Sequence, residues 1–256
     1  MKEQPNAVQN AKKLLQEYQN QCLKNNNPEV LYNHIIHSSR VEQILNYTAN
    51  ISGKVLDIGC FDGFITEKIL KQGNKEVIGM DRWEEAMELT RSKGIETVWG
   101  DMDNPQIPFA DNYFDCVVAA DVFNSIFDPD AVMEEVTRIL KPQGKLIITV
   151  PNLASSGNRL LMLLGFAPYN LQVRARTGAG HLRLFTFRTL KKLLLDYNFT
   201  VQKMTSTVVI FPFFRLRPNI PEYRQPRIFF SKFLARLFPK LGESIVVIAE
   251  NKKNQI

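Results

Sequence analysis

The sequence predicts a doubly wound α/β fold in which a seven-stranded, mostly parallel sheet is covered by helices on both faces. Two observations point to it. Short apolar runs rich in β-branched residues alternate with helical stretches, and these runs are too apolar along their length for one side to face water. A chain of 256 residues, 45% of them hydrophobic, is long enough to bury such a core.

Two helices are expected before the α/β repeat. Apolar residues recur at helical spacing over residues 6–24 and 28–47, and the turn-like segment NNNP separates the two stretches. These helices precede the first strand and lie outside the strand–helix alternation.

Five strands alternate with three helices between residues 54 and 150. The strand segments are KVLDI, EVIGM, ETVWG, FDCVVAA and GKLIITV, in which β-branched and other apolar residues predominate. The segments between them, GFITEKILKQG, RWEEAMELTRSKG and PDAVMEEVTRILKPQG, have apolar residues at helical spacing and end at a glycine. This alternation predicts parallel strands joined by crossover helices.

One more helix and two more strands complete the predicted sheet. Thr186 stands where its side chain would cap the helix TFRTLKKLLLDYNF, and the segments TVQKMTSTVVIF and ESIVVIAENK are typical of strands. Two insertions, at about 152–185 and 211–243, do not belong to a plain α/β repeat. Specificity commonly resides in such added segments.

The net charge of +6 conceals an asymmetry between the two parts of the chain. Residues 1–150 hold 15 Lys and Arg against 22 Asp and Glu, whereas residues 151–256 hold 17 against 4. A basic second part suits an anionic partner, such as a phosphorylated substrate, a membrane surface or a nucleic acid, and it equally suits a solvated face.

Cysteine and histidine usage argues against disulfides and metals. The three cysteines are an odd number without C-x-x-C spacing. His34 and His37 stand at i, i+3 on a predicted helix without a carboxylate or cysteine partner motif, so no metal is expected.

No run approaches the ~20 apolar residues that span a bilayer, and the first residues lack the apolar segment of a secretory signal. We therefore expect a cytoplasmic protein, with peripheral membrane contact as a further option.

A ligand-binding turn is predicted in the stretch KVLDIGCFDG. Asp57 lies at the end of a strand, and Gly59 and Gly63 precede a helix, so that a tight turn can expose backbone N–H groups to a ligand. The glycines are spaced G-x-x-x-G, unlike the G-x-G-x-x-G of a dinucleotide fingerprint. A carboxylate pointing into the loop would repel a pyrophosphate but suits a positively charged cofactor, which favours S-adenosylmethionine.

This stretch resembles the first motif of class I S-adenosylmethionine-dependent methyltransferases, which commonly is V-L-D-I-G-C-G-x-G. Four later segments resemble further motifs of that family: VIGMD, WGDMDN, IPFADNYFDCVVAADVFNSIFDP and ILKPQGKLIITVPN. The resemblance covers about residues 53 to 152, and five motifs in the family's order make it specific. It implies the Rossmann-like methyltransferase fold, methyl transfer as the activity, and S-adenosyl-L-methionine as the cofactor.

The resemblance also implies which residues bind the cofactor. Asp81 matches the acidic residue whose carboxylate bonds the ribose hydroxyls, and Asp101 with the backbone of Met102 would meet the adenine. Phe61 replaces the family's middle glycine, so its ring either points away from the cofactor or presses on it. Ser125 stands where many relatives carry histidine. The expected cofactor-binding residues are Asp57, Gly59, Cys60, Phe61, Gly63, Asp81, Arg82, Asp101, Met102 and Ala120.

His181 and Asp121 are the candidate catalytic residues. His181 lies in GAGHLRLFTFRTLKKLL, which resembles a segment of small-molecule methyltransferases, including the quinone-type O-methyltransferases, whose histidine sits over the substrate pocket. It could act as the general base that a hydroxyl acceptor requires, anchor the substrate, or form a structural hydrogen bond. Asp121 follows the fourth strand, at the edge where open α/β sheets bind ligands, and could contact a ligand or cap the next turn.

The family also suggests a division of the chain. Residues 1–50 would form an N-terminal helical lid, and residues 51–256 would form the methyltransferase domain with its two insertions.

An aromatic and basic segment lies within the second insertion. Residues 227–238, placed on a helix, give a stripe of Phe and Leu flanked by Lys232 and Arg236, a composition typical of a helix at a membrane interface. Peripheral membrane contact is therefore expected within 211–240. Packing on the sheet edge or on a second subunit, as in a homodimer, explains the same stripe.

The leading functional hypothesis is O-methylation of a small or lipid-linked molecule. A non-catalytic module of the same fold is the first alternative. RNA methylation is the second, since arginines and aromatic rings also bind RNA, but no RNA-binding module accompanies them. DNA is not expected for two reasons. ADVFN replaces the (N/D)-P-P-(Y/F) motif of methylases that act on base amino groups. Methylases that act on the five position of pyrimidines use a nucleophilic cysteine, whereas Cys116 lies within an apolar strand.

Overall fold

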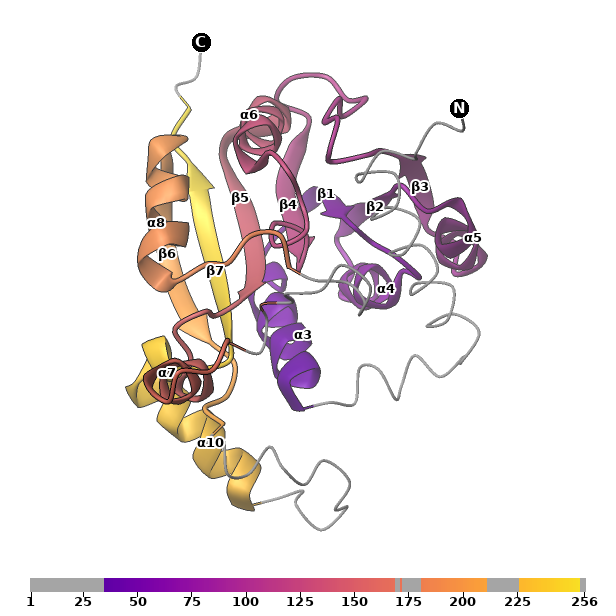
Figure 1. Cartoon of the computed structure of the whole chain (residues 1–256). Helices are drawn as coiled ribbons and strands as arrows, with labels where there is room; N and C mark the ends of the chain where they lie inside the picture. Colours follow the sequence, from indigo (N-terminus) through magenta and orange to yellow (C-terminus); the bar gives the residue numbers. More distant parts are fainter. Residues whose placement is uncertain (1–34, 169–170, 172–180, 211–225, 254–256) are drawn as a thin grey trace, which may run out of the picture.

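Seven strands form one sheet with the order β3-β2-β1-β4-β5-β7-β6 in the computed structural model, which describes residues 35–168, 171, 181–210 and 226–253 (Figure 1). Strands β1 to β5 pair in parallel, and β7 runs antiparallel to both of its neighbours. The predicted mostly parallel, seven-stranded sheet is thus confirmed. The strands are β1 Gly53–Ile58, β2 Lys75–Asp81, β3 Glu96–Trp99, β4 Phe114–Ala120, β5 Leu140–Pro151, β6 Phe199–Ser206 and β7 Ser244–Asn251.

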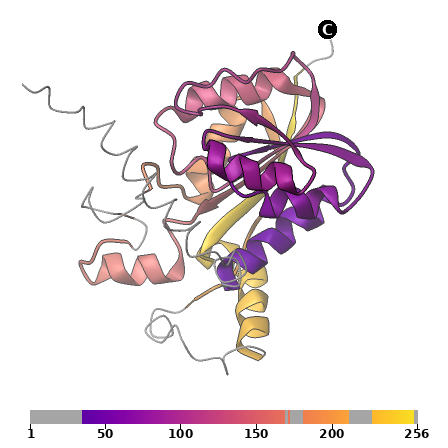
Figure 2. The ribbon, with the colours of Figure 1, turned by 90° about the vertical axis from the view of Figure 1, so that its right-hand side faces the viewer.

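Helices cover both faces of this sheet (Figures 1 and 2). Residues of α3 and α4 pack on one face around Val55, Val118 and Ile147, and residues of α6 and α8 pack on the other face. The described helices are α3 Ile35–Thr48, α4 Phe64–Leu70, α5 Glu84–Ser92, α6 Pro129–Ile139, α7 Ser156–Leu163, α8 Phe187–Asp196, α10 Pro226–Leu237 and the 3-10 turn η2 Pro239–Leu241.

Local sequence signals set where helices begin. Asp128 accepts hydrogen bonds from the backbone N–H groups of Asp130 and Ala131 at the start of α6, with Pro129 at the first helical position. Thr186 caps α8 as predicted, and Thr189 completes a reciprocal capping box.

The carboxyl ends of six strands meet at one edge of the sheet. Strands β1 to β5 are parallel, and β6 is parallel to β5 because both are antiparallel to β7. The turn before α4, the segments after β2, β3 and β4, and helix α7 therefore all start from this edge. Open α/β sheets bind ligands at such an edge.

Helix α3 belongs to the layer that covers the sheet. Its Ile44 is fully buried among core residues of the sheet. Residues 1–34 lie outside the described part of the chain, so the N-terminal lid stays a prediction for them. Each of the two predicted insertions contributes a helix, α7 in the first and α10 in the second.

Candidate functional site

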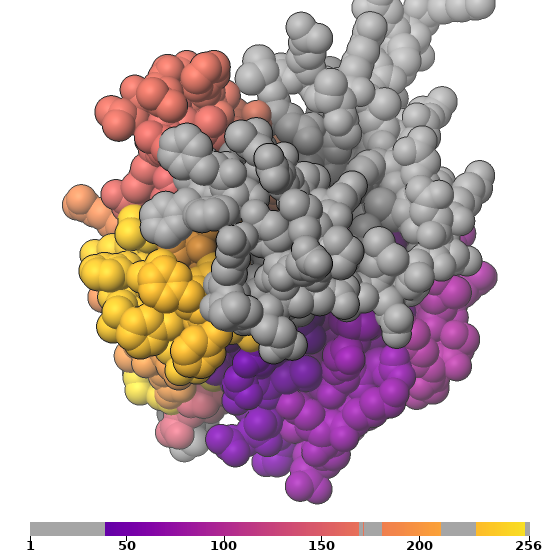
Figure 3. All heavy atoms as spheres, turned by 90° about the horizontal axis from the view of Figure 1, so that it is seen from below, coloured from indigo at the N-terminus to yellow at the C-terminus, as the bar shows by residue number. Residues whose placement is uncertain are grey.

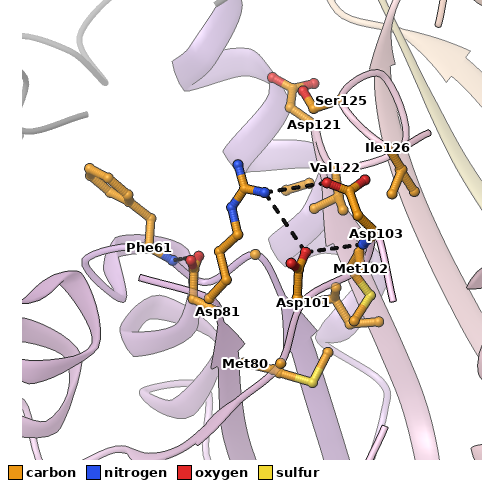
Figure 4. Close-up of a pocket in the computed structure, with 15 residues that line it drawn as sticks. Phe61, Met80, Asp81, Asp101, Met102, Asp103, Asp121, Val122, Ser125 and Ile126 are labelled. Atoms are coloured by element: carbon orange, nitrogen blue, oxygen red, sulfur yellow. Dashed lines mark hydrogen bonds and ion pairs between the residues drawn. The ribbon is translucent and has the colours of Figure 1, made fainter. Parts of the chain in front are cut away.

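A pocket opens at the carboxyl ends of β1, β2 and β4 (Figure 4). Seven of the ten predicted cofactor-binding residues line it, whereas Asp57, Cys60 and Gly63 do not. The lining residues are Ile58, Gly59, Phe61, Met80, Asp81, Arg82, Gly100, Asp101, Met102, Asp103, Ala120, Asp121, Val122, Ser125 and Ile126.

The turn between β1 and α4 requires glycine at two positions. Gly59 has φ +73°, and a Cβ there would lie 2.6 Å from Cγ2 of Val122. Gly63 has φ +72°, and a Cβ there would lie 2.7 Å from Oγ1 of Thr90. A side chain at either position would be strained by the backbone and would also clash. The glycine pair therefore fixes a turn that lies tightly against its neighbours.

Phe61 occupies a conformation that a bulky residue rarely adopts, with φ +50°. Its N–H donates to Oδ2 of Asp81 at 2.9 Å, and its carbonyl accepts from the Thr90 hydroxyl at 2.9 Å. The ring packs on Trp83 with centroids 5.2 Å apart, and in Figure 4 it is turned away from Asp101. The backbone of Phe61 therefore bonds to Asp81 and Thr90 while its ring lies to one side, on Trp83.

Asp57 lies beneath the turn. Its side chain is 2% exposed, and Oδ2 accepts a hydrogen bond from the Thr66 hydroxyl of α4 at 2.7 Å. Burial, opposed by that hydrogen bond and supported by the charge of Asp81, raises the pKa of Asp57 to about 7. The sequence predicts that this carboxylate points into the loop; the structure turns it toward α4, because the hydroxyl of Thr66 is its partner there.

Asp81 joins the turn to the end of β2. Its Oδ1 accepts from the N–H of Trp83 at 3.0 Å, while Oδ2 accepts from Phe61. Burial raises the pKa of Asp81, and the backbone hydrogen bonds oppose this rise. The Asp81 carboxylate therefore lines the pocket while it accepts hydrogen bonds from the N–H groups of Phe61 and Trp83.

Arg82 lies between two further carboxylates. Its Nη1 is 3.4 Å from Oδ2 of Asp103 and 3.7 Å from Oδ1 of Asp101. Asp101 in turn accepts from the N–H of Asp103 at 3.1 Å (Figure 4). Among the described residues, one cation thus lies against two anions on this side of the pocket. The wall beside it is apolar and is formed by Met80, Met102 and Ile126.

Asp121 has its carboxylate in an ion pair. The residue has φ +58°, its Oδ1 accepts from the Thr149 hydroxyl at 3.3 Å, and its Oδ2 pairs with Arg40 of α3. Arg40 is only 6% exposed. Sequence analysis missed it, although its position four residues before Ile44 puts a charge on the buried face of an amphipathic helix.

His181 reaches the same region from the first insertion. Its Nδ1 lies 2.5 Å from Nδ2 of Asn124, a buried residue three positions after Asp121. Burial, with a contribution from the charge of Arg40, lowers the pKa of His181 below its ordinary value, so the imidazole is neutral at neutral pH. The structure thus brings His181, Asn124, Asp121 and Arg40 together at the carboxyl end of β4.

His34 and the side chain of His37 lie outside the described part of the chain. Among the residues that the structure describes, no three His, Cys, Asp or Glu side chains are grouped to hold a metal ion. Cys60 and Cys116 are free and buried, and burial raises the pKa of both thiols.

A family model connects this geometry with known proteins. Residues 56–148 match the family described as "Methyltransferase domain". The ubiquinone biosynthesis O-methyltransferase of Idiomarina loihiensis is 30% identical over 126 residues, which are 46% of this chain and 51% of that protein. The ubiquinone/menaquinone biosynthesis C-methyltransferase of Saccharophagus degradans is 31% identical over 115 residues, 40% of this chain and 46% of that one. The chain spans about half the length of these curated relatives.

Solved structures share the fold at lower identity. A SAM-dependent methyltransferase from Thermotoga maritima has a TM-score of 0.66 and 18% identity, covering 94% of this chain and 99% of that chain. The cyclase SpnF has a TM-score of 0.58 and 14% identity, covering 85% and 83%. At these identities the likeness shows the fold alone, which different activities share.

Proposed function

We propose that this chain, which belongs to the class I S-adenosylmethionine-dependent methyltransferases, methylates a hydroxyl oxygen of a small or lipid-linked acceptor. The observation that carries the proposal is the carboxylate of Asp81, which lies at the end of β2 and 2.9 Å from the amide of the turn after β1. The names of both curated relatives place them in quinone biosynthesis, which supports a small or lipid-linked acceptor, and the O-methyltransferase supports a hydroxyl oxygen.

The residues of the pocket fit S-adenosylmethionine. Asp81 offers two carboxylate oxygens to a pair of ribose hydroxyls, and Met102 and Ile126 offer an apolar wall to adenine. A Cβ at Gly59 would meet Val122, so only glycine keeps the turn open beside the pocket. A pyrophosphate fits less well, because Asp101 and Asp103 outnumber Arg82.

S-adenosylmethionine, when bound, supplies a methyl group carried on a sulfonium sulfur, and the leaving group after transfer is a neutral thioether. Transfer of this methyl group to a hydroxyl oxygen would require the hydroxyl proton to leave. His181 accepts this proton at Nε2 when the amide oxygen of Asn124, rather than its NH2 group, faces Nδ1 and holds the Nδ1–H. Its lowered pKa keeps the imidazole in the basic, neutral form.

Asn124 sets the tautomer that this role requires. Its Oδ1 is buried without a hydrogen-bond partner among the described residues. Rotating the amide by half a turn brings this oxygen to Nδ1 of His181, where it accepts the Nδ1–H and leaves the lone pair on Nε2. Asn124 is therefore a positioning residue, and Asp121 with Arg40 fixes α3 against the same edge.

Calorimetric titration tests the proposal at the level of the cofactor. We expect saturable binding of S-adenosylmethionine with one site per chain and no detectable binding of NAD at the same concentration. Formation of S-adenosylhomocysteine with phenolic and lipid-linked hydroxyl compounds then tests transfer. No binding to the wild type would end the proposal; binding without turnover across these acceptors would favour a non-catalytic module.

Replacement of Phe61 by glycine tests the variant turn. We expect the affinity for S-adenosylmethionine to stay within about threefold of the wild type, because the backbone N–H to Asp81 is kept and the ring lies on Trp83. Phe61→Ala serves as a control that loses the same ring but keeps the strained backbone. A rise in affinity of tenfold or more in both variants would show that the ring obstructs the pocket.

A further inference from the structure

Helices α7 and α10 leave large apolar side chains in solvent. Leu163 at the end of α7 is 81% exposed, and Phe229 of α10 is 75% exposed. We call the whole set the α7–α10 surface. It consists of Leu163, Leu164, Phe166, Phe229, Phe230, Phe233, Leu237 and Phe238. Exposed apolar groups of this number on one end of a protein mark an interaction site.

Both helices are held at the carboxyl edge of the sheet. The Ser156 hydroxyl of α7 donates to the carbonyl of Ile210 at 2.9 Å, and the N–H of Val209 donates to the carbonyl of Ser231 in α10 at 3.3 Å. Two consecutive residues after β6 thus anchor the two helices. Figure 3 looks onto this end of the molecule and shows both helices at its left.

Packing within the described part of the chain buries a small residue of α10. Ala235 is buried and the Ser231 hydroxyl donates to the carbonyl of Val209, whereas the phenylalanines stay exposed. Packing on the sheet edge, one of the explanations for the Phe and Leu stripe, therefore accounts for the helix position but leaves its aromatic residues exposed.

The two segments that carry the α7–α10 surface contain charged residues of one sign. Residues 152–168 and 226–242 contain five basic and no acidic residues, namely Arg159, Arg227, Lys232, Arg236 and Lys240. Lys232 is paired with Glu42 of α3. Aromatic residues flanked by cations are the composition of a surface that lies in the headgroup region of an anionic bilayer. A second copy would bring the same cations face to face, since a twofold interface uses the same patch twice.

We propose that the α7–α10 surface docks on an anionic lipid bilayer. The described helices include none that is both long and apolar enough to cross one, so the contact is with the membrane surface. Because the pocket and the α7–α10 surface share the carboxyl edge, docking holds the pocket close to the lipid. This proposal does not rest on methyl transfer and can be tested without cofactor.

Sedimentation with vesicles tests the docking, using the full chain. We expect binding to vesicles of phosphatidylcholine with about 30% phosphatidylglycerol, much weaker binding to pure phosphatidylcholine, and a loss of binding as salt rises. The triple variant Phe229→Ser, Phe230→Ser, Phe233→Ser should lower the partition coefficient about tenfold or more. Leu195→Ser on α8, where the leucine is 53% exposed, is the matched apolar control.

A double charge-reversal variant measures the electrostatic contribution to vesicle binding. Arg236→Glu with Lys240→Glu should weaken binding to the anionic vesicles about tenfold, whereas Lys191→Glu with Lys192→Glu on α8 should leave it within twofold. Circular dichroism checks that each variant is folded. Equal binding by the variants and their controls, or no binding of the wild type to anionic vesicles, would overturn the proposal. So would a wild-type dimer that the phenylalanine variants dissociate, because the surface would then be a subunit interface.

Discussion

Replacement of Asp81 by alanine is expected to lower the affinity for S-adenosylmethionine by about 100-fold or more. Hydrogen bonds to a charged group contribute about 1.5–3 kcal/mol each, and under the proposed function this carboxylate accepts two from the ribose. The loss of its bonds to Phe61 and Trp83 also loosens the turn beside the pocket. Isothermal titration calorimetry measures the affinity directly.

Two further variants separate ligand binding from turn stability. Asp81→Asn keeps one acceptor oxygen and should lose less affinity than Asp81→Ala. Glu76→Ala removes a carboxylate from the other end of the same strand, where the residue pairs with Lys54 3.7 Å away, and should bind as the wild type does. Thermal melting gives the change in stability separately. An Asp81→Ala protein that is folded and binds with wild-type affinity would remove Asp81 from the site.

The fold could be predicted because its signals are local. Each β-strand is an apolar run of its own, and the caps of α6 and α8 lie within a few residues of the helices they begin. Gly59 and Gly63 were identified for the same reason, since the left-handed turn needs them where they stand.

The parts that were missed depend on contacts between distant segments. Arg40 meets Asp121 across 81 positions of sequence, and Asn124 meets His181 across 57. No spacing rule connects such pairs. The direction of the Asp57 side chain also could not be predicted from the sequence, because its hydrogen-bond partner, Thr66, reaches it only once α4 packs on the sheet. The exposed leucines of α7 show the same limit, since an apolar stripe looks alike whether it is covered or not.

Replacement of His181 by asparagine is expected to lower kcat by about 100-fold or more, in line with the contribution of a general base. Asparagine keeps a hydrogen-bonding group near the place of Nδ1, so the contact with Asn124 can persist while Nε2 is lost. The affinity for S-adenosylmethionine should change little, because His181 does not line the cofactor pocket. Turnover under saturating cofactor measures kcat, and calorimetry measures the affinity.

The pH dependence of kcat distinguishes a base from a structural histidine. Burial and Arg40 lower the pKa of His181 below about 6.5, so kcat should be flat at neutral pH and fall only as the pH drops through this lowered value. Arg40→Gln removes a positive charge and leaves the carboxylate of Asp121 without that partner. Both changes favour the imidazolium, so the acid limb should move to higher pH.

Arg40→Lys is the matched control, because it keeps the charge and should leave the acid limb near its wild-type position.

Asn124→Ala removes the group that holds the tautomer of His181 and should lower kcat without a comparable rise of KM. If His181 has only a structural role, His181→Asn would lower the melting temperature while kcat of the folded protein keeps its value. In that case Arg40→Gln could not move the limb, since the group that sets it would be absent from the reaction.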